Sequence, residues 1–291
     1  MIRYDSLLGT YHGSVVVHER TLTIDGLVIT LLQERDAQKL PWRDLGIDYV
    51  VDATGHYTDA QNAREHITSG AQKVIITAPA HGEDITIVMG VNTTQYNANQ
   101  HAIISLGSCT TNAVVPLLEV IKDHTPIVST MVSTVHAYTN TQHLLDVDAH
   151  ARDPRTSRAA ACNIIPTSTG AATSVTAVLP EFKESLCAQA LRVPVPIVSL
   201  ADVTVLLERA VTRDELHGWY QDAAATSLKN ILEVSPEKLV SGDFKGNRHS
   251  VILDAPMTMV CGKLVRVYGW YDNEWGYSNR IKDFLNFIST R

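Results

Sequence analysis

Apolar residues in the first third of the chain occur in short continuous runs that are separated by turn residues. Alternation around Gly26 predicts a β-hairpin over residues 21–32. Four continuous runs predict buried strands at 48–55, 73–79, 84–90 and 102–105. A helix that starts with a capping box of Thr58 and Gln61 is predicted between the first two strands, over residues 58–70. Such strands and helices in alternation are typical of a parallel sheet with both faces covered.

The pattern changes in the second half of the chain, where longer strand-like segments appear. These segments cover residues 126–138, 187–208 and 263–272, with helical stretches around 170–179 and 212–227. This order favours an α+β arrangement with a larger, mainly antiparallel sheet. The chain ends on an amphipathic helix over residues 279–291, whose apolar face consists of Ile281, Phe284, Leu285 and Ile288.

The two patterns together predict an α/β protein of two domains. A parallel-sheet domain is expected in residues 1–108, and an α+β domain with a mainly antiparallel sheet is expected in residues 109–275. Residues 276–291 are expected to form a C-terminal helix that packs back on the first domain. The length of 291 residues agrees with two domains.

Composition narrows the classes of function. The chain is 45% hydrophobic and 19% charged, as is typical of soluble globular proteins. Its net charge of -7 argues against nucleic acid as the main partner, and no stretch predicts a membrane span. Residues 1–9 lack the pattern of a signal peptide. The chain has four widely spaced cysteines, so we expect no metal site, no disulfide framework and a cytoplasmic location.

One cysteine occupies a position where helices make thiols reactive. The segment SLGSCTTNAVVPLLEVI, residues 105–121, indicates a strand end, a tight turn at Gly107 and a helix. Ser108 is a good N-cap, which places Cys109 in the first helical turn, and Pro116 is expected to kink the helix. Unpaired N–H groups and the helix dipole favour the thiolate, so Cys109 is a candidate nucleophile with a lowered pKa. The alternative is a small buried residue without chemistry.

Four other features are candidate partners for this thiol. His136 ends the predicted strand 126–138, where a base is held rigidly, although a surface or core histidine explains it as well. Arg192 interrupts an apolar run, either as an anion clamp or as an edge-strand arginine that reaches water. Residues 165–175 carry hydroxyls and a glycine before a helix, which suits an anion site or an ordinary cap. Residues 269–280 are rich in aromatic and amide groups, as in a ligand wall or a subunit interface.

Together these segments resemble the phosphorylating glyceraldehyde-3-phosphate dehydrogenase family. The resemblance covers nearly the whole chain and rests on five motifs in family order: SCTTN, TVHAYTN, NIIPTSTGAA, LRVPVP and WYDNEWGYSNR. It implies a Rossmann-like nucleotide-binding domain in residues 1–108 and a catalytic domain in residues 109–275. It also implies an oxidoreductase that converts D-glyceraldehyde 3-phosphate to 1,3-bisphosphoglycerate through a cysteine thioester, in glycolysis and gluconeogenesis. The implied partners are a phosphorylated aldehyde and inorganic phosphate. The implied assembly is a homotetramer in which residues 138–161 reach a neighbour's cofactor.

The resemblance also implies roles for single residues. Cys109 is implied to be the catalytic thiol and His136 its base. The residues implied for binding the substrate phosphate and the attacking phosphate are Ser108, Thr110, Thr139, Thr141, Thr169, Gly170 and Arg192. The residues implied for binding the cofactor are Thr54, Gly55 and Thr77 at the adenosine end, with Asn273 and Tyr277 at the nicotinamide end. The implied cofactor is NAD, and residues 145–158, which lack a proline common in NAD-preferring members, leave NADP open.

One family element is absent from the sequence. Family members begin with a glycine-rich strand–helix–strand unit, and no G-x-G-x-x-G occurs in the 291 residues. We therefore expect an N-terminally truncated Rossmann-like domain that binds the pyrophosphate of NAD poorly and leaves a free sheet edge near 49–52 and 74–77. The alternative function is that of a short paralogue with weak or no dinucleotide binding. Such a paralogue acts as a thiol-dependent acyl-phosphate or ester hydrolase or as a non-enzymatic interaction protein.

Overall fold

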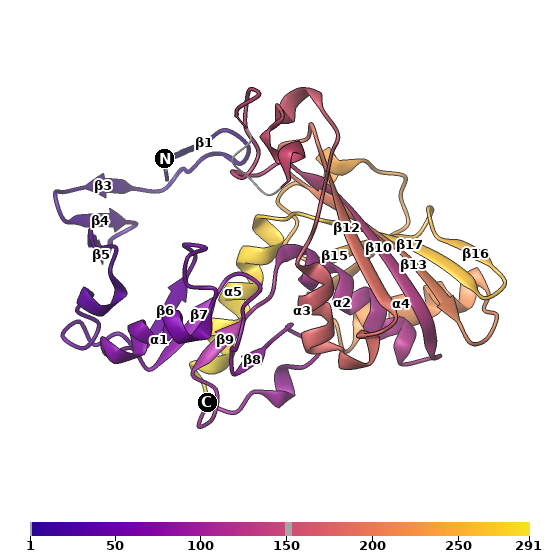
Figure 1. Ribbon diagram of the computed structural model, residues 1–291, viewed down its shortest axis with the longest axis horizontal. Helices are drawn as coiled ribbons and strands as arrows, with labels where there is room; N and C mark the ends of the chain where they lie inside the picture. The colour runs from indigo at the N-terminus through magenta and orange to yellow at the C-terminus, as the bar shows by residue number, and fades with distance from the viewer. Residues whose placement is uncertain (1, 149–152) are drawn as a thin grey trace.

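The computed structural model describes residues 2–148 and 153–291. A four-stranded sheet and an eight-stranded sheet dominate these residues. Figure 1 shows the smaller sheet on the left and the larger sheet on the right, with helix α5 (Trp275–Ile288) beside the smaller one. The predicted α/β architecture with one parallel and one larger sheet is therefore confirmed.

The smaller sheet has the strand order β6-β7-β9-β8, and all its neighbouring strands run parallel. Its strands are β6 (Tyr49–Asp52), β7 (Lys73–Ile76), β8 (Ile85–Thr86) and β9 (Ile103–Ser105). This is the parallel sheet that the continuous apolar runs predict. The strand β6 is an edge strand, but β7 lies between β6 and β9, so the expected free edge at 74–77 is wrong.

Helix α1 (Ala60–Thr68) connects β6 to β7. Its N-cap is Asp59, whose side chain accepts the Gln61 N–H at 2.8 Å, so the predicted capping box of Thr58 and Gln61 is wrong. Two adjacent residues with side-chain oxygens compete for the cap, and the helix dipole favours the carboxylate. Gly70 follows the helix with a φ of +120°, and the predicted helix end is confirmed.

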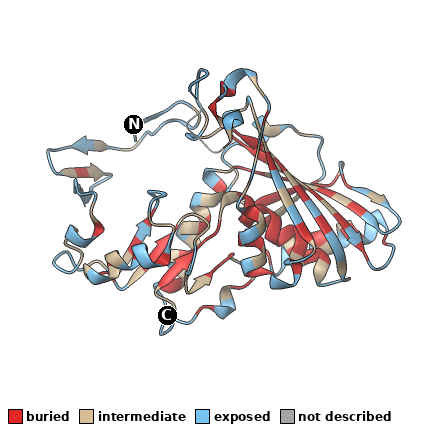
Figure 2. Cartoon of the chain, viewed as in Figure 1, coloured by how far each residue is buried: buried red, intermediate tan, exposed pale blue. Residues whose placement is uncertain are grey.

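The N-terminal residues form two small antiparallel sheets. One pairs β1 (Tyr4–Asp5) with β2 (Gly9–Thr10), and the other joins β3 (Val15–Val17), β4 (Thr21–Ile24) and β5 (Leu27–Thr30). The predicted hairpin is therefore confirmed. Its turn residues, Asp25 and Gly26, have φ values of 48° and 86°, the left-handed values that a type I′ turn requires. Figure 2 shows that little of β3, β4 and β5 is buried.

The larger sheet has the strand order β11-β12-β10-β13-β17-β15-β14, with β16 paired to β17. Its strands are β10 (Ile127–Ala137), β11 (Ile165–Thr167), β12 (Leu186–Val193), β13 (Ser199–Leu207), β14 (Leu232–Ser235), β15 (Val251–Asp254), β16 (Met259–Cys261) and β17 (Leu264–Tyr271). Neighbouring strands are antiparallel except for β10 with β12 and β14 with β15. The predicted, mainly antiparallel sheet is therefore confirmed.

Helices cover one face of the larger sheet and join it to the smaller one. Helices α2 (Cys109–Lys122), α3 (Ala171–Val178) and α4 (Arg213–Ala225) contribute to the apolar core on that face (Figure 1). Helix α5 follows β17, and its Phe284 and Ile288 pack with Ile75 and Ile104 of the smaller sheet. The last helix therefore links the two sheets.

Short 3-10 helices complete the described part of the chain. They are η1 (Ala37–Lys39), η2 (Thr93–Gln95), η3 (Pro154–Ser157), η4 (Ala160–Cys162), η5 (Pro180–Phe182) and η6 (Ser241–Phe244). Part of the expected inter-subunit loop 138–161, residues 149–152, lies outside the described residues. Within 2–148 and 153–291, every helix is too short or too polar to cross a membrane.

Candidate active site

Cys109 begins helix α2 just after strand β9 ends. The chain reverses at Gly107, whose φ is +62° and where an added Cβ would lie 3.0 Å from Thr111. Ser108 then caps the helix, because its Oγ accepts the Thr111 N–H at 3.0 Å and Thr111 Oγ1 accepts the Ser108 N–H at 3.1 Å. The predicted N-cap is therefore confirmed, and it fixes Cys109 in the first turn.

His136 faces the thiol from the end of strand β10. Its Nε2 lies 3.5 Å from Cys109 Sγ, a hydrogen-bond distance for sulfur. Its Nδ1 lies 2.7 Å from the Ala137 carbonyl oxygen. When Nδ1–H donates to that carbonyl, Nε2 is the bare nitrogen that faces the thiol, which is the form that a base needs. The imidazole is 5% exposed, so little water competes for this contact.

Arg192 lies beside His136 because β10 and β12 run parallel with these two residues in register. Its Nη1 donates to the Ala137 carbonyl at 3.0 Å, which is the same acceptor that Nδ1–H of His136 faces. The shared carbonyl brings Nη1 to 2.5 Å from Nδ1, and with the proton on Nδ1 these two donors form no hydrogen bond with each other. Its Nε is buried and has no hydrogen-bond partner among the described residues. This buried guanidinium N–H is therefore a donor that is available to a ligand.

Burial determines the protonation of the thiol and the imidazole. Desolvation raises the pKa of the Cys109 thiol, while hydrogen bonds from Thr110 and the charge of Arg192 oppose that rise. Desolvation and the charge of Arg192 lower the pKa of His136 from 6.5 to about 4. The predicted lowering of the thiol pKa is therefore wrong, because burial outweighs the helix terminus. At neutral pH both groups are therefore uncharged, and His136 Nε2 is the ring nitrogen that faces the thiol.

A buried hydroxyl network connects the helix of Cys109 to the strand of His136. Tyr271 Oη lies 2.9 Å from Thr110 Oγ1 and 2.7 Å from Thr134 Oγ1. Thr110 follows the thiol on α2, and Thr134 lies two residues before His136 on the same face of β10. The sequence indicates Tyr271 only as part of the aromatic segment 269–280. Thr134 was missed, although its spacing from the histidine was a usable signal.

Four of the hydroxyls expected to bind phosphate lie at the start of helix α2 and just after strand β10. Ser108 Oγ lies in the cap of α2, and Thr110 is buried beside the thiol. Thr139 and Thr141 follow β10, and their hydroxyl oxygens lie 3.0 Å apart. Thr139 lines a cavity of about 500 Å³ whose other walls include Tyr138, His143 and Glu274.

Thr169 and Gly170 lead into helix α3. Thr169 Oγ1 accepts the Ala171 N–H at 3.1 Å, and Gly170 precedes the first helical residue. The preceding strand β11 pairs with β12 so that Ile165 lies opposite Arg192 and Thr167 lies opposite Ala190. The structure thus brings His136 into direct contact with both Cys109 and Arg192. Within the described residues, no hydrogen bond joins these three to Thr139, Thr141 or Thr169.

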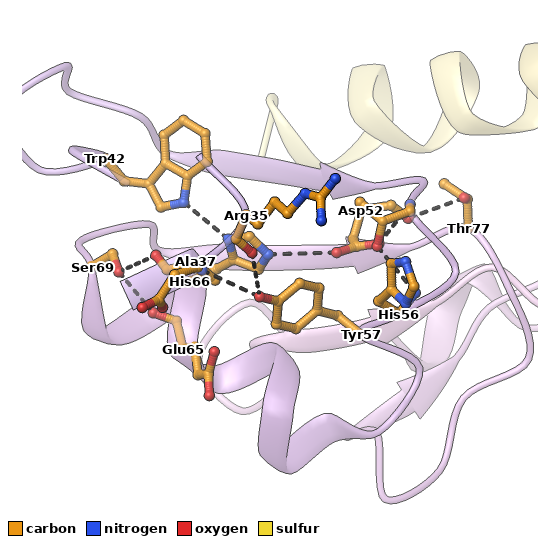
Figure 3. Close-up of polar contacts among 12 residues, drawn as sticks. Arg35, Ala37, Trp42, Asp52, His56, Tyr57, Glu65, His66, Ser69 and Thr77 are labelled. Atoms are coloured by element: carbon orange, nitrogen blue, oxygen red, sulfur yellow. Dashed lines mark hydrogen bonds and ion pairs between the residues drawn. The ribbon is translucent and has the colours of Figure 1, made fainter. Parts of the chain in front are cut away.

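Asp52 orders both threonines that are expected at the adenosine end. Its Oδ1 accepts the Thr54 N–H at 2.9 Å and the Thr54 hydroxyl at 2.8 Å. Its backbone carbonyl accepts the Thr77 N–H and the Thr77 hydroxyl, both at 3.0 Å. Figure 3 shows the carboxylate pointing at His66, whose Nε2 lies 3.5 Å from Oδ2. Asp52 had one usable signal in the sequence, because it is an acid at the carboxyl end of a buried strand.

His66 is held from its other side by Trp42. The indole N–H donates to His66 Nδ1 at 3.0 Å, so the proton of the neutral ring is on Nε2 and faces Asp52. Figure 3 shows Tyr57 against the imidazole, with ring centroids 5.0 Å apart. This network borders a cavity of about 700 Å³, which is large enough for a cofactor fragment. The cavity is lined by Glu34, Arg35, Ala37, Leu40, Thr54, His56, Tyr57 and His66.

The residues expected at the nicotinamide end lie close to the thiol. Tyr277 Oη donates to the Gly107 carbonyl at 2.8 Å, which ties α5 to the turn before Cys109. Asn273 Oδ1 accepts the Ser199 hydroxyl at 3.0 Å. Within the described residues its Nδ2 has no hydrogen-bond partner, so that amide N–H is available to a ligand carbonyl.

Two family models match the chain. Residues 108–273 match "Glyceraldehyde 3-phosphate dehydrogenase, C-terminal domain", and residues 1–60 match "Glyceraldehyde 3-phosphate dehydrogenase, NAD binding domain". The chain belongs to the glyceraldehyde-3-phosphate dehydrogenase family. The C-terminal match begins at Ser108, the cap of the cysteine helix, and contains both His136 and Arg192.

Full-length relatives agree with this family assignment. The chain is 45% identical over 291 residues to the glyceraldehyde-3-phosphate dehydrogenase of Kitasatospora aureofaciens, which covers 100% of the chain and 87% of the relative. It is 47% identical over 292 residues to glyceraldehyde-3-phosphate dehydrogenase 1 of Bacillus subtilis, with the same coverage of 100% and 87%. The resemblance in the motifs is confirmed, and the alternative of a hydrolase or an interaction protein is not favoured. The chain is an NAD-dependent oxidoreductase of the glyceraldehyde-3-phosphate dehydrogenase family.

Proposed function

We propose that the protein catalyses the phosphorylating oxidation of D-glyceraldehyde 3-phosphate to 1,3-bisphosphoglycerate, a step of glycolysis and gluconeogenesis. One observation carries the proposal: Cys109 Sγ lies 3.5 Å from His136 Nε2 beside Arg192, whose buried Nε lacks a partner among the described residues. A nucleophile, a base and an anion clamp in one site suit a reaction that joins a thiol, an aldehyde and phosphate. The names of the relatives support this substrate.

The first half of the reaction makes a thioester on Cys109. The thiol proton moves to His136 Nε2 while Sγ forms a bond to the aldehyde carbon, and the carbonyl oxygen takes up the proton to give a hemithioacetal. His136 then accepts the hydroxyl proton as the carbon–oxygen double bond is restored. NAD, when bound, would supply the acceptor for the hydride that leaves the same carbon. A neutral His136, with its pKa lowered to about 4, is in the form that accepts these protons.

The second half of the reaction releases the product. Inorganic phosphate attacks the thioester carbon, the carbon–sulfur bond breaks, and the proton on His136 returns to the Cys109 thiolate. Arg192 is proposed to hold the phosphate groups with its Nε and its planar fork of donors. Ser108, Thr110, Thr139, Thr141, Thr169 and Gly170 are proposed to supply further donors. Fixed orientation of this kind is worth several kcal/mol of barrier.

The residues at both ends of the proposed cofactor site suit NAD. Asn273 offers an amide N–H to the carboxamide of the nicotinamide, and Tyr277 borders the same space beside Cys109. Thr54, Gly55 and Thr77 are proposed for the adenosine end. Gly55 has a φ of +72° and nothing within 4 Å of the position of a Cβ, so a ligand can approach the backbone there.

We also propose a cytoplasmic homotetramer. All four cysteines are free, which suits a reducing compartment. The face of the larger sheet away from the helices exposes Met131, Leu206 and Leu264, at 70%, 38% and 47%, and Leu206 pairs directly with Leu264. Apolar side chains on such a face favour contact with a second copy. Sedimentation equilibrium tests this, and a mass of 31.9 kDa in solution would contradict it.

The phosphate role of Arg192 predicts a specific loss on substitution. In the wild-type protein, millimolar phosphate should slow the alkylation of Cys109 by iodoacetamide. Arg192→Ala should weaken this protection by about ten- to a hundredfold in phosphate concentration, because two or more charge-assisted hydrogen bonds are lost. Arg192→Lys should restore it only in part, because an ammonium group cannot make the bidentate contact.

The rate of alkylation is followed by mass spectrometry of the peptide that carries Cys109. Arg209→Ala is the matched control, because Arg209 lies over the Trp219 ring and pairs with Glu215 away from the thiol. Full phosphate protection in Arg192→Ala would show that the arginine has only a structural role.

A further inference from the structure

Ser199 links the base of the reaction to the residue proposed to orient the nicotinamide. It is the first residue of β13 and is 1% exposed. Its Oγ accepts the Ala137 N–H at 3.1 Å and donates to Asn273 Oδ1 at 3.0 Å. The same hydroxyl therefore accepts a hydrogen bond from the backbone next to His136 and donates one to the side chain of Asn273.

The hydrogen bond from Ala137 matters because the backbone of this residue contacts both His136 and Arg192. Its N–H belongs to the peptide unit directly after His136, so Ser199 fixes the backbone from which the imidazole extends. Its carbonyl lies 2.7 Å from His136 Nδ1 and accepts from Arg192 Nη1 at 3.0 Å. The orientation of the base and that of the anion clamp therefore both depend on the segment that Ser199 holds.

The backbone before Ser199 is strained. Val198 has a φ of 69°, in the left-handed region that a β-branched residue rarely adopts. Val198 and Ile197 are 2% and 6% exposed, and both pack with Phe244 and Ile252. Strain of this kind persists where the surrounding structure enforces it, and it is typical of functional sites.

We propose that Ser199 is a positioning residue that holds His136 and Asn273 in register, so that proton removal and hydride departure occur at the same carbon. This inference rests on the proposed function and deepens it. Ser199 touches no reacting atom; it acts through the Ala137 peptide on one side and the Asn273 amide on the other. The fixed Asn273 carbonyl also leaves its Nδ2 as the group presented to a ligand.

The charged and titratable groups around the imidazole come from four elements. Cys109 on α2 faces Nε2, and Arg192 on β12 faces Nδ1. Tyr271 on β17 packs edge-to-face with the imidazole, and the two ring centroids lie 5.9 Å apart. Tyr277 on α5 ties down the turn before the thiol. Burial raises the pKa of both tyrosines, so neither phenol titrates between pH 5 and 9.

The test compares iodoacetamide alkylation of Cys109 from pH 5 to 9 in four proteins. Ser199→Ala should lower the rate at pH 7 by roughly tenfold and move the profile to higher pH, because the imidazole no longer faces the thiol in a fixed orientation. Ser235→Ala is the matched control, since Ser235 is also buried and bonded but lies at the end of β14. Its profile should match that of the wild type.

Ser199→Thr keeps the hydroxyl and should restore most of the rate. A wild-type profile in Ser199→Ala would overturn the inference, and so would equal losses in the Ala and Thr variants, since packing and not the hydroxyl would then set the rate. A second readout is steady-state kinetics, where Ser199→Ala should lower kcat more than it raises the KM for the aldehyde.

A different outcome would contradict the proposed function itself. If Cys109 of the wild-type protein reacts no faster than the exposed cysteines, the proposed function fails. Failure of the role of Ser199 is therefore distinguished from failure of the proposed function.

Discussion

Cys109→Ala is expected to lower phosphate-dependent NADH formation by roughly 10⁴- to 10⁶-fold, the range found when a covalent nucleophile is removed from an enzyme. The thiol is the only group that forms the thioester, and no other cysteine replaces it, because Cys162, Cys187 and Cys261 are exposed on the surface. The fold should survive, since the alanine leaves the Ser108 cap and the Thr110–Tyr271 bond in place.

The measurement is NADH absorbance with D-glyceraldehyde 3-phosphate, NAD and phosphate, together with the thermal midpoint of each protein. Cys187→Ala is the control, because Cys187 lies on the exposed face of β12, and it should keep wild-type activity. Retained activity in Cys109→Ala would mean that the reaction uses another nucleophile.

His136→Gln is expected to lower kcat by about 10²- to 10⁴-fold, the usual contribution of a general base. The amide keeps a hydrogen-bonding group near Cys109 but accepts no proton. The alkylation of Cys109 should slow as well, because the thiol pKa is raised by burial and the imidazole is the acceptor of its proton. A variant with wild-type kcat would remove His136 from the mechanism.

His136→Gln, which lowers kcat, is expected to reduce the loss of folding stability in acid. The pKa of His136 is lowered from 6.5 to about 4, so between these values the unfolded chain binds a proton that the folded protein does not. Stability is therefore fully present above about pH 6.5 and is lost as the pH falls toward 4. The loss amounts to about 2 kcal/mol at pH 5. Urea unfolding at pH 7.5 and pH 5 should show a smaller acid loss in His136→Gln than in the wild type.

The sequence predicted those parts of the site that are local in the chain. Ser108, Gly107 and Cys109 are consecutive, so the turn, the cap and the first helical turn follow from residue type and spacing alone. The apolar runs likewise predicted the parallel strands, because burial on both faces leaves a continuous apolar signature. The helix cap at Asp59 was missed by one residue, because two neighbouring side chains compete for the same N–H group.

The rest of the site depends on partners that are distant in the chain. Ser199 bonds to Ala137 and Asn273 across 62 and 74 residues, and Thr110 bonds to Tyr271 across 161 residues. No periodicity encodes such pairs. The predicted direction of the pKa shift of Cys109 was wrong for the same reason. The helix terminus that lowers this pKa is visible in the sequence, whereas the burial that raises it comes from the packing of distant segments.

The claim that the reaction runs through a thioester on Cys109 is tested most directly by mixing the protein with D-glyceraldehyde 3-phosphate and NAD without phosphate. We expect a burst of NADH no larger than the amount of protein, and an acyl group on the peptide that carries Cys109 in the mass spectrum. Added phosphate should remove that group and release an acyl phosphate. Continuous NADH formation without phosphate, or an acyl group on any other residue, would contradict the proposed mechanism.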